Sequence, residues 1–166
     1  MSTDRLLAGL KQSKLFRGLG TAGLESLERT GSAVELDAGD VIIEEGQRVT
    51  DLFVVIRGEL EVFLPKTKSR LTRVRVARMA PGDCIGEYSF VDKNLASASV
   101  AAKVPSEVFR ISQAEFERHL DADPAIGRTV YRNLLRLLVA RLREDNQLLD
   151  LFRPVVPGKP APRSEG

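Results

Sequence analysis

The sequence predicts a mainly β protein with flanking helices: an antiparallel β-roll, or jelly roll, followed by a long C-terminal helix. Three observations support this fold class. Between Ser32 and Ser112, short runs with a period of two are separated by turn signals rich in glycine and proline. The segments on either side have helical periodicity instead. The last of them carries a heptad-like apolar pattern to about Phe152.

Length and composition limit the class of protein further. The 166 residues are 43% hydrophobic, enough for one packed domain with appendages and too much for a disordered chain. The net charge of +2 gives no global indication of a nucleic-acid or membrane partner. One cysteine, Cys84, excludes an internal disulfide and favours a cytoplasmic location. The sequence contains no apolar run that could span a membrane.

Four segments are expected along the chain. They are an N-terminal helical segment (1–30), a β-roll with a short helix (31–122), a long C-terminal helix (123–152) and a proline-rich tail (153–166). The first should contain two helices, Thr3 to Gln12 and Thr21 to Arg29, joined by a segment that docks on the roll. The tail has four prolines and no core-forming pattern, so we expect it to be disordered or extended.

Within the β region, the clearest pair of strands is DLFVVIRG followed by ELEVFL, residues 51–64. In the second strand the apolar residues alternate with Glu59, Glu61 and Phe63; they are Leu60, Val62 and Leu64. Because Arg57-Gly58 lies between the two strands, we expect it to form a hairpin turn.

Two start signals predict the C-terminal helices. Ser112, followed three residues later by Glu115, has the pattern of a capping box and predicts a helix to about Leu120. Asp123 is an N-cap residue followed by Pro124 at the first helical position, where proline is favoured. The long helix should therefore begin here.

The long helix has two apolar stripes, which require two packing partners. The first stripe can cover the roll: Ile126, Val130, Leu134 and Leu137. The second is heptad-like and predicts a homodimer through pairing with the same helix of another chain: Tyr131, Leu135, Leu138, Leu142, Leu149 and Phe152. The alternative is that both stripes pack on one domain.

The functional prediction centres on PGDCIGEYSFVDKNLASASV, residues 81–100. A short apolar strand ends at Gly86, where the backbone can be approached closely, and Glu87 and one helical turn follow. Free N–H groups of a helical turn favour an anion, and a carboxylate accepts hydrogen bonds from hydroxyls. The stretch therefore suits a small anionic ligand that carries a sugar.

This stretch resembles the phosphate-binding cassette of cyclic-nucleotide-binding domains, which reads Phe-Gly-Glu-Leu-Ala-Leu and then Pro-Arg-Ala-Ala-Thr-Val. The resemblance covers roughly Leu15 to Leu142, because further residues match the family's strand pattern: Gly46, Asp51, Phe53, Ile56, Gly58 and Val62. It implies that Glu87 accepts a hydrogen bond from a ribose hydroxyl. The candidate ligand-binding residues are Gly86, Glu87, Tyr88, Ser89, Ala96, Ser97, Ala98 and Ser99.

One position departs from the family pattern. The arginine that grips the cyclic phosphate in the family falls on Ala96. Two charge-assisted contacts of roughly 1.5–3 kcal/mol each would be lost, which corresponds to about two to four decades in affinity. Lys93 can substitute in part as a point charge, although a loop lysine is more commonly solvated.

A run of cations without an acidic residue lies between Pro65 and Arg78. It contains Lys66, Lys68, Arg70, Arg73 and Arg75. One interpretation is a solvated hairpin whose edge strand is protected by charge. The other is a docking patch for an acidic protein, nucleic acid or anionic lipid.

The sequence indicates a non-catalytic regulatory module without a bound cofactor or metal. It shows no catalytic triad or metal-ligand spacing, and its one histidine, His119, is expected to face water. Catabolite-activator-type transcription factors look similar as far as the long helix, but here we expect no DNA-binding domain to follow. Two hypotheses remain: a dimeric adaptor for a partner protein that no longer binds cyclic AMP or cyclic GMP, and a cyclic-nucleotide sensor.

Overall fold

The structure of the protein, a computed structural model, describes residues 3–151. Its helices are α1 (Thr3–Gln12), α2 (Thr21–Glu28), α3 (Glu87–Asp92), α4 (Gln113–Ala122) and α5 (Pro124–Leu151). Its strands are β1 (Ser32–Leu36), β2 (Val41–Ile43), β3 (Asp51–Arg57), β4 (Leu60–Leu64), β5 (Val74–Met79), β6 (Cys84–Ile85), β7 (Ser99–Ala102) and β8 (Ser106–Ser112).

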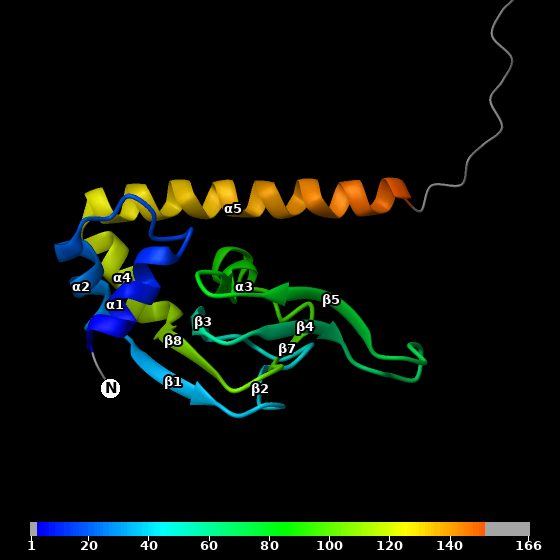
Figure 1. The fold of residues 1–166 in the computed structure, drawn as a ribbon. Helices are drawn as coiled ribbons and strands as arrows, with labels where there is room; N and C mark the ends of the chain where they lie inside the picture. The colour runs from blue at the N-terminus through cyan, green and yellow to red at the C-terminus, as the bar shows by residue number, and fades with distance from the viewer. Residues whose placement is uncertain (1–2, 152–166) are drawn as a thin grey trace, which may run out of the picture.

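The strands form two antiparallel four-stranded sheets, in the orders β1-β8-β3-β6 and β2-β7-β4-β5. The helices α1, α2 and α4 gather at one end of the roll, and α5 passes along it (Figure 1). This arrangement confirms the predicted fold class, an antiparallel β-roll with flanking helices and a long C-terminal helix.

Strand β3 is buried on both faces and separates two apolar clusters. Leu52, Val54 and Ile56 belong to the cluster that also contains apolar residues of the helices. Phe53 and Val55 alternate with them and belong to the cluster between the two sheets. Because successive side chains of a strand point to opposite faces, one seven-residue strand joins both clusters.

The predicted hairpin at Arg57-Gly58 is wrong. Strand β3 pairs with β8 and β6, whereas β4 pairs with β5 and β7 in the other sheet. Gly58 has a φ of 90°, and a Cβ there would lie 2.2 Å from the Oγ atom of Ser106. The chain thus crosses from one sheet to the other here, and the glycine lets the crossing pass close to β8.

Both predicted helix starts are confirmed. The hydroxyl of Ser112 accepts a hydrogen bond of 3.1 Å from the backbone N–H of Glu115, at the start of α4. A carboxylate oxygen of Asp123 accepts from the N–H groups of Ala125 and Ile126, at 3.0 and 3.1 Å, at the start of α5. These side chains satisfy N–H groups that have no partner within the helix.

The proximal half of α5 is fixed to the body of the protein. Its first apolar stripe is buried, with Val130, Leu134 and Leu137 in the cluster shared with the other helices. The buried amide of Asn133 donates to the carbonyl oxygens of Leu15 and Arg17, at 3.0 and 2.7 Å. The distal part of the helix extends beyond this contact (Figure 1). No helix within residues 3–151 is long and apolar enough to cross a membrane.

We expect Gly58→Ala to destabilise the protein more than Gly39→Ala. Both glycines have positive φ, at 90° and 99°, and alanine in that conformation costs about 1–2 kcal/mol. A Cβ at Gly39 meets open space, whereas one at Gly58 overlaps Ser106, which adds about 1–3 kcal/mol of overpacking. Urea unfolding of the two variants measures the difference. Equal losses would contradict the close crossing between the sheets.

Candidate functional site

The cassette begins where β6 ends, at a position that accommodates only glycine. Gly86 has a φ of 89°, and a Cβ on it would lie 2.6 Å from the carbonyl oxygen of Asp51 on β3. The left-handed backbone turns the chain directly into α3. Glu87, the first residue of that helix, is thereby directed into the protein and is 1% exposed.

The buried carboxylate of Glu87 forms an ion pair with Arg141 of α5. The second terminal nitrogen of Arg141 donates to the carbonyl oxygen of Cys84, at 2.8 Å. The same guanidinium lies 5.7 Å from the centre of the Tyr88 ring. One side chain of α5 thus contacts the end of β6 and the start of α3 together.

Sequence reasoning missed Arg141, although a signal was present. Arg141 follows Leu137 by four residues and Leu134 by seven, so it continues the buried stripe of α5. A charged residue at a core-facing position of a helix requires a buried partner. The structure provides that partner in Glu87.

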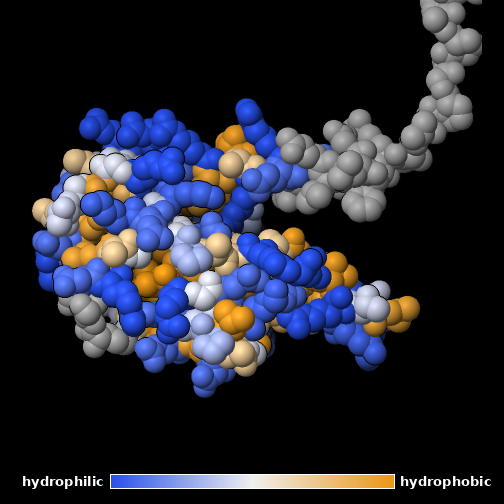
Figure 2. Space-filling view, in the orientation of Figure 1, coloured by the Kyte–Doolittle hydropathy of each residue, from blue (hydrophilic) through white to orange (hydrophobic). Residues whose placement is uncertain are grey.

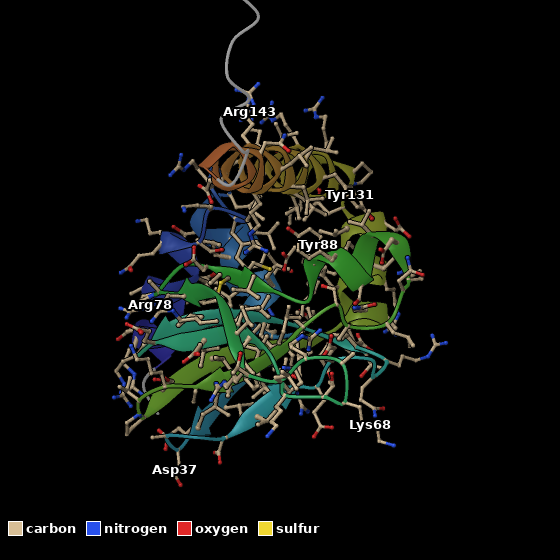
Figure 3. All side chains as sticks on the ribbon, turned by 90° about the vertical axis from the view of Figure 1, so that its right-hand side faces the viewer. Asp37, Lys68, Arg78, Tyr88, Tyr131 and Arg143 are labelled. Atoms are coloured by element: carbon tan, nitrogen blue, oxygen red, sulfur yellow. The ribbon has the colours of Figure 1, made fainter. Side chains whose placement is uncertain are left out.

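Aromatic contacts join α3 to the other helices. Phe90 stacks on Tyr131 of α5, with ring centres 6.5 Å apart and planes at 17°. Phe90 also lies 5.3 Å from Phe116 of α4. Figure 3 shows Tyr88 on the side of α3 that faces α5. Tyr131, predicted to face a second chain, is therefore engaged within its own chain while remaining 38% exposed.

The second half of the cassette is tied to the connection between β2 and β3. Ala96 is 8% exposed, lies in the apolar cluster between the sheets, and exchanges backbone hydrogen bonds of 2.8 Å with Gly46 and Gln47. The hydroxyl of Ser99 accepts from the N–H of Glu45, at 2.9 Å. The position that carries the family's arginine is thus occupied by a small apolar side chain.

The remaining predicted site residues have different surroundings. Ser89 is buried, Ala98 is half-buried and Ser97 is exposed. Lys93, the suggested substitute cation, pairs with Glu117 of α4 at 3.7 Å and lies 4.8 Å from the centre of the Phe90 ring. Its charge is therefore held near α4.

Comparison with known proteins agrees with this geometry. The model of the cyclic nucleotide-binding domain family matches residues 33–123, more than half of the chain. The chain belongs to this family. A cyclic nucleotide-binding domain from Methylobacillus flagellatus superimposes with a TM-score of 0.78 at 24% identity, covering 92% of this chain and 85% of that one.

Two further relatives share the domain. The Thermus thermophilus catabolite activator protein superimposes with a TM-score of 0.72 at 27% identity, over 84% of this chain and 62% of that one. The Pycsar effector protein XpPycTIR of Xanthomonas perforans is 29% identical over 150 residues. That match covers 90% of this chain and 46% of the relative, so the chain spans less than half of the relative's length.

The basic hairpin between β4 and β5 is partly neutralised by partners from other segments. Arg70 donates two hydrogen bonds to the carboxylate of Glu45, at 3.0 and 3.1 Å, and these bonds hold the pKa of that carboxyl below its usual value. Arg73 pairs with Glu61 at 3.5 Å and lies 3.6 Å from the centre of the Phe63 ring. Of the predicted patch, Lys66, Lys68, Arg73 and Arg75 are exposed and Arg70 is half-buried.

The second apolar stripe of α5 is only partly exposed. Leu135 and Leu142 are 64% and 60% exposed, whereas Leu138 packs against the cluster shared by the helices. The side chain of Leu149 and all of Phe152 lie outside the described part of the structure. His119, predicted to face water, is half-buried, and its Nε2 atom is buried. No three potential metal ligands cluster within the described residues.

We expect the single thiol of the protein to be unreactive in the folded state. Cys84 is fully buried, and this burial raises the pKa of its thiol to about 12. Near neutral pH its thiolate fraction is lower than that of an exposed thiol by roughly a thousandfold. Reaction with a chromogenic disulfide should be slow in buffer and complete in urea. A native rate equal to that of free cysteine would contradict the burial of β6.

Proposed function

We propose that this member of the family is a non-catalytic, cytoplasmic regulatory module that acts as a dimeric adaptor for a partner protein. Its cassette, in this proposal, does not hold cyclic AMP or cyclic GMP in the resting state. One observation carries the proposal: the carboxylate of Glu87 is already paired with a cation of the same chain, and no cation stands at residue 96 to replace it. Glu87 pairs with Arg141, and Ala96 lies in an apolar cluster.

Energetic considerations support the loss of ordinary ligand affinity. A bidentate arginine is the side chain best suited to grip a phosphate, and residue 96 lacks any such group. The retained carboxylate of Glu87 cannot substitute for it, because a carboxylate repels a phosphate. Lys93 is held near Glu117. A cyclic phosphate would therefore enter without its usual charge partner.

Exposed apolar groups support a second copy of the chain as a contact of α5. On the helix these are Leu135, Val139 and Leu142, which are 64%, 48% and 60% exposed. On the β4–β5 hairpin they include Leu71 and Val76, at 80% and 51% exposed. Figure 2 shows hydrophobic surface over both elements. A second α5 lying against these groups would bury the apolar side chains that one chain leaves exposed.

A cyclic-nucleotide sensor is the second candidate function. The left-handed Gly86 and the buried Glu87 retain the geometry of the first half of the cassette. The relative from Xanthomonas perforans is named an effector protein, which supports a signalling role for the domain that the two proteins share. In this alternative a ligand enters the roll and displaces α5.

We expect calorimetric titration of the nucleotide-free protein with cyclic AMP and cyclic GMP to show no binding up to millimolar concentration. Ala96→Arg should raise the affinity for one of them at least tenfold if only the phosphate contact is missing. The same titration with cyclic CMP and cyclic UMP tests the pyrimidine bases, and we expect no binding of these either. Micromolar binding by the wild-type protein that Glu87→Ala abolishes would instead establish the sensor.

We expect Leu135→Asp combined with Leu142→Asp to convert a dimer into a folded monomer in sedimentation velocity. Both side chains are exposed in the single chain, so their replacement places new charges only in the predicted contact between copies. Arg136→Gln with Arg143→Gln is the matched control, because these exposed residues of α5 lie further around the helix from Leu135 and Leu142. A wild-type monomer at all concentrations would disprove dimerisation through α5.

A further inference from the structure

We propose that Arg141 is an internal ligand of the cassette, whose contact with Glu87 latches α5 onto α3 and must be displaced before any external ligand uses that carboxylate. This inference rests on the proposed function, because it gives a physical reason why the cassette would not hold cyclic AMP or cyclic GMP. In this proposal, Arg141 of α5 determines whether an external ligand can reach the carboxylate of Glu87.

The burial of Glu87 makes the latch necessary. Its side chain is 2% exposed, and Arg141, at 23% exposed, is the partner that pairs with it. A carboxylate buried without a partner is strongly unfavourable, because the surrounding protein replaces little of its lost hydration. The cassette in this conformation therefore requires α5 to keep Arg141 in place.

The geometry of Arg141 is that of a ligand bound by several groups. Its guanidinium meets a carboxylate on Glu87, a carbonyl oxygen on Cys84 and the ring of Tyr88. The first two are hydrogen-bond acceptors, which suit the hydroxyl groups of a sugar as well as the N–H groups of arginine. Sugar hydroxyls and Arg141 would thus compete for the same acceptors.

The latch also indicates the class of ligand that could open it. Arginine keeps its positive charge, and the Tyr88 ring also contacts the guanidinium of Arg141. An Arg141 that has lost Glu87 but stays beside the cassette is therefore stabilised by a negative charge nearby. A neutral polyol would leave that guanidinium unpaired, and an anion without hydroxyls would leave Glu87 unpaired. An anion with a terminal phosphate and several free hydroxyls, such as an open sugar phosphate, can satisfy both side chains together. Cyclic AMP and cyclic GMP lie outside this class, because their phosphate is a singly charged diester and their ribose has one free hydroxyl.

Cys84 provides a natural reporter for the latch, because its own carbonyl oxygen binds Arg141 and its thiol is buried. We expect Arg141→Met to raise the rate of thiol labelling at least tenfold and to lower the urea midpoint by about 1 M or more. Arg143→Met is the matched control: it is exposed on the same helix and points away from the body (Figure 3). The control should match the wild type in both measurements.

A double-mutant cycle separates the latch from a general packing effect. Glu87→Gln combined with Arg141→Met removes both charges, so this variant should recover more than half of the midpoint lost by Arg141→Met alone. The proposal would be overturned if the double variant lost as much urea midpoint as the two single variants together. It would also be overturned if Arg141→Met behaved like Arg143→Met. If Arg141→Met does not fold, increased labelling of Glu87→Gln decides the question, since Arg141 then loses its anion.

The ligand class is tested on the wild-type protein by thiol labelling. Ribose 5-phosphate at millimolar concentration should accelerate labelling, whereas ribose alone and inorganic phosphate alone should not. Labelling that ribose 5-phosphate leaves unchanged, or that ribose raises equally, would overturn displacement by this class. Micromolar binding of cyclic AMP by the wild type would refute the proposed adaptor function, whereas an additive mutant cycle would refute only the latch.

Discussion

The structure depends on the pairing of one buried carboxylate. Gly86 turns the backbone so close to Asp51 that the next residue, Glu87, enters the protein interior. A buried charge without a partner costs several kcal/mol, so the fold must supply a cation at this point. Arg141 supplies it from a helix that is distant in sequence. The position of α5 relative to the β-roll is therefore set by electrostatics as well as by apolar packing.

This pairing connects the cassette to the exposed face of the long helix. Phe90 of α3 stacks on Tyr131, and Glu87 of the same short helix binds Arg141, almost three turns further along α5. A movement of α3 would disturb both contacts at once. Leu135 and Leu142, which lie on the exposed stripe between and beyond these contacts, would then change position. An event in the cassette would thus alter the exposed face of α5, which we propose as the contact with a second chain.

The sequence predicted the fold class and the cassette helix because both depend on local patterns. The period of two, the capping residues Ser112 and Asp123, and Gly86 act within a few residues of themselves. The hairpin at Gly58 was wrong because strand alternation does not reveal which sheet a strand joins. The partner of Glu87 was missed because a contact across 54 residues leaves only an indirect signal, a charge in the buried stripe of α5.

The relative size of two effects decides whether the cassette stays closed. Removing one partner from a buried ion pair costs about 3–5 kcal/mol. A ligand that separates Glu87 from Arg141 and pairs with only one of them would have to overcome a free-energy cost of this size. A cassette arginine would add roughly 1.5–3 kcal/mol for each charge-assisted contact to a phosphate, enough to offset much of that cost. Residue 96 is alanine, so this contribution is absent, and in our proposal the Glu87–Arg141 contact is therefore favoured over a bound phosphate. In the proposed latch, only a ligand that satisfies both Glu87 and Arg141 avoids the cost, so the adaptor and the sensor would differ in ligand chemistry rather than in architecture.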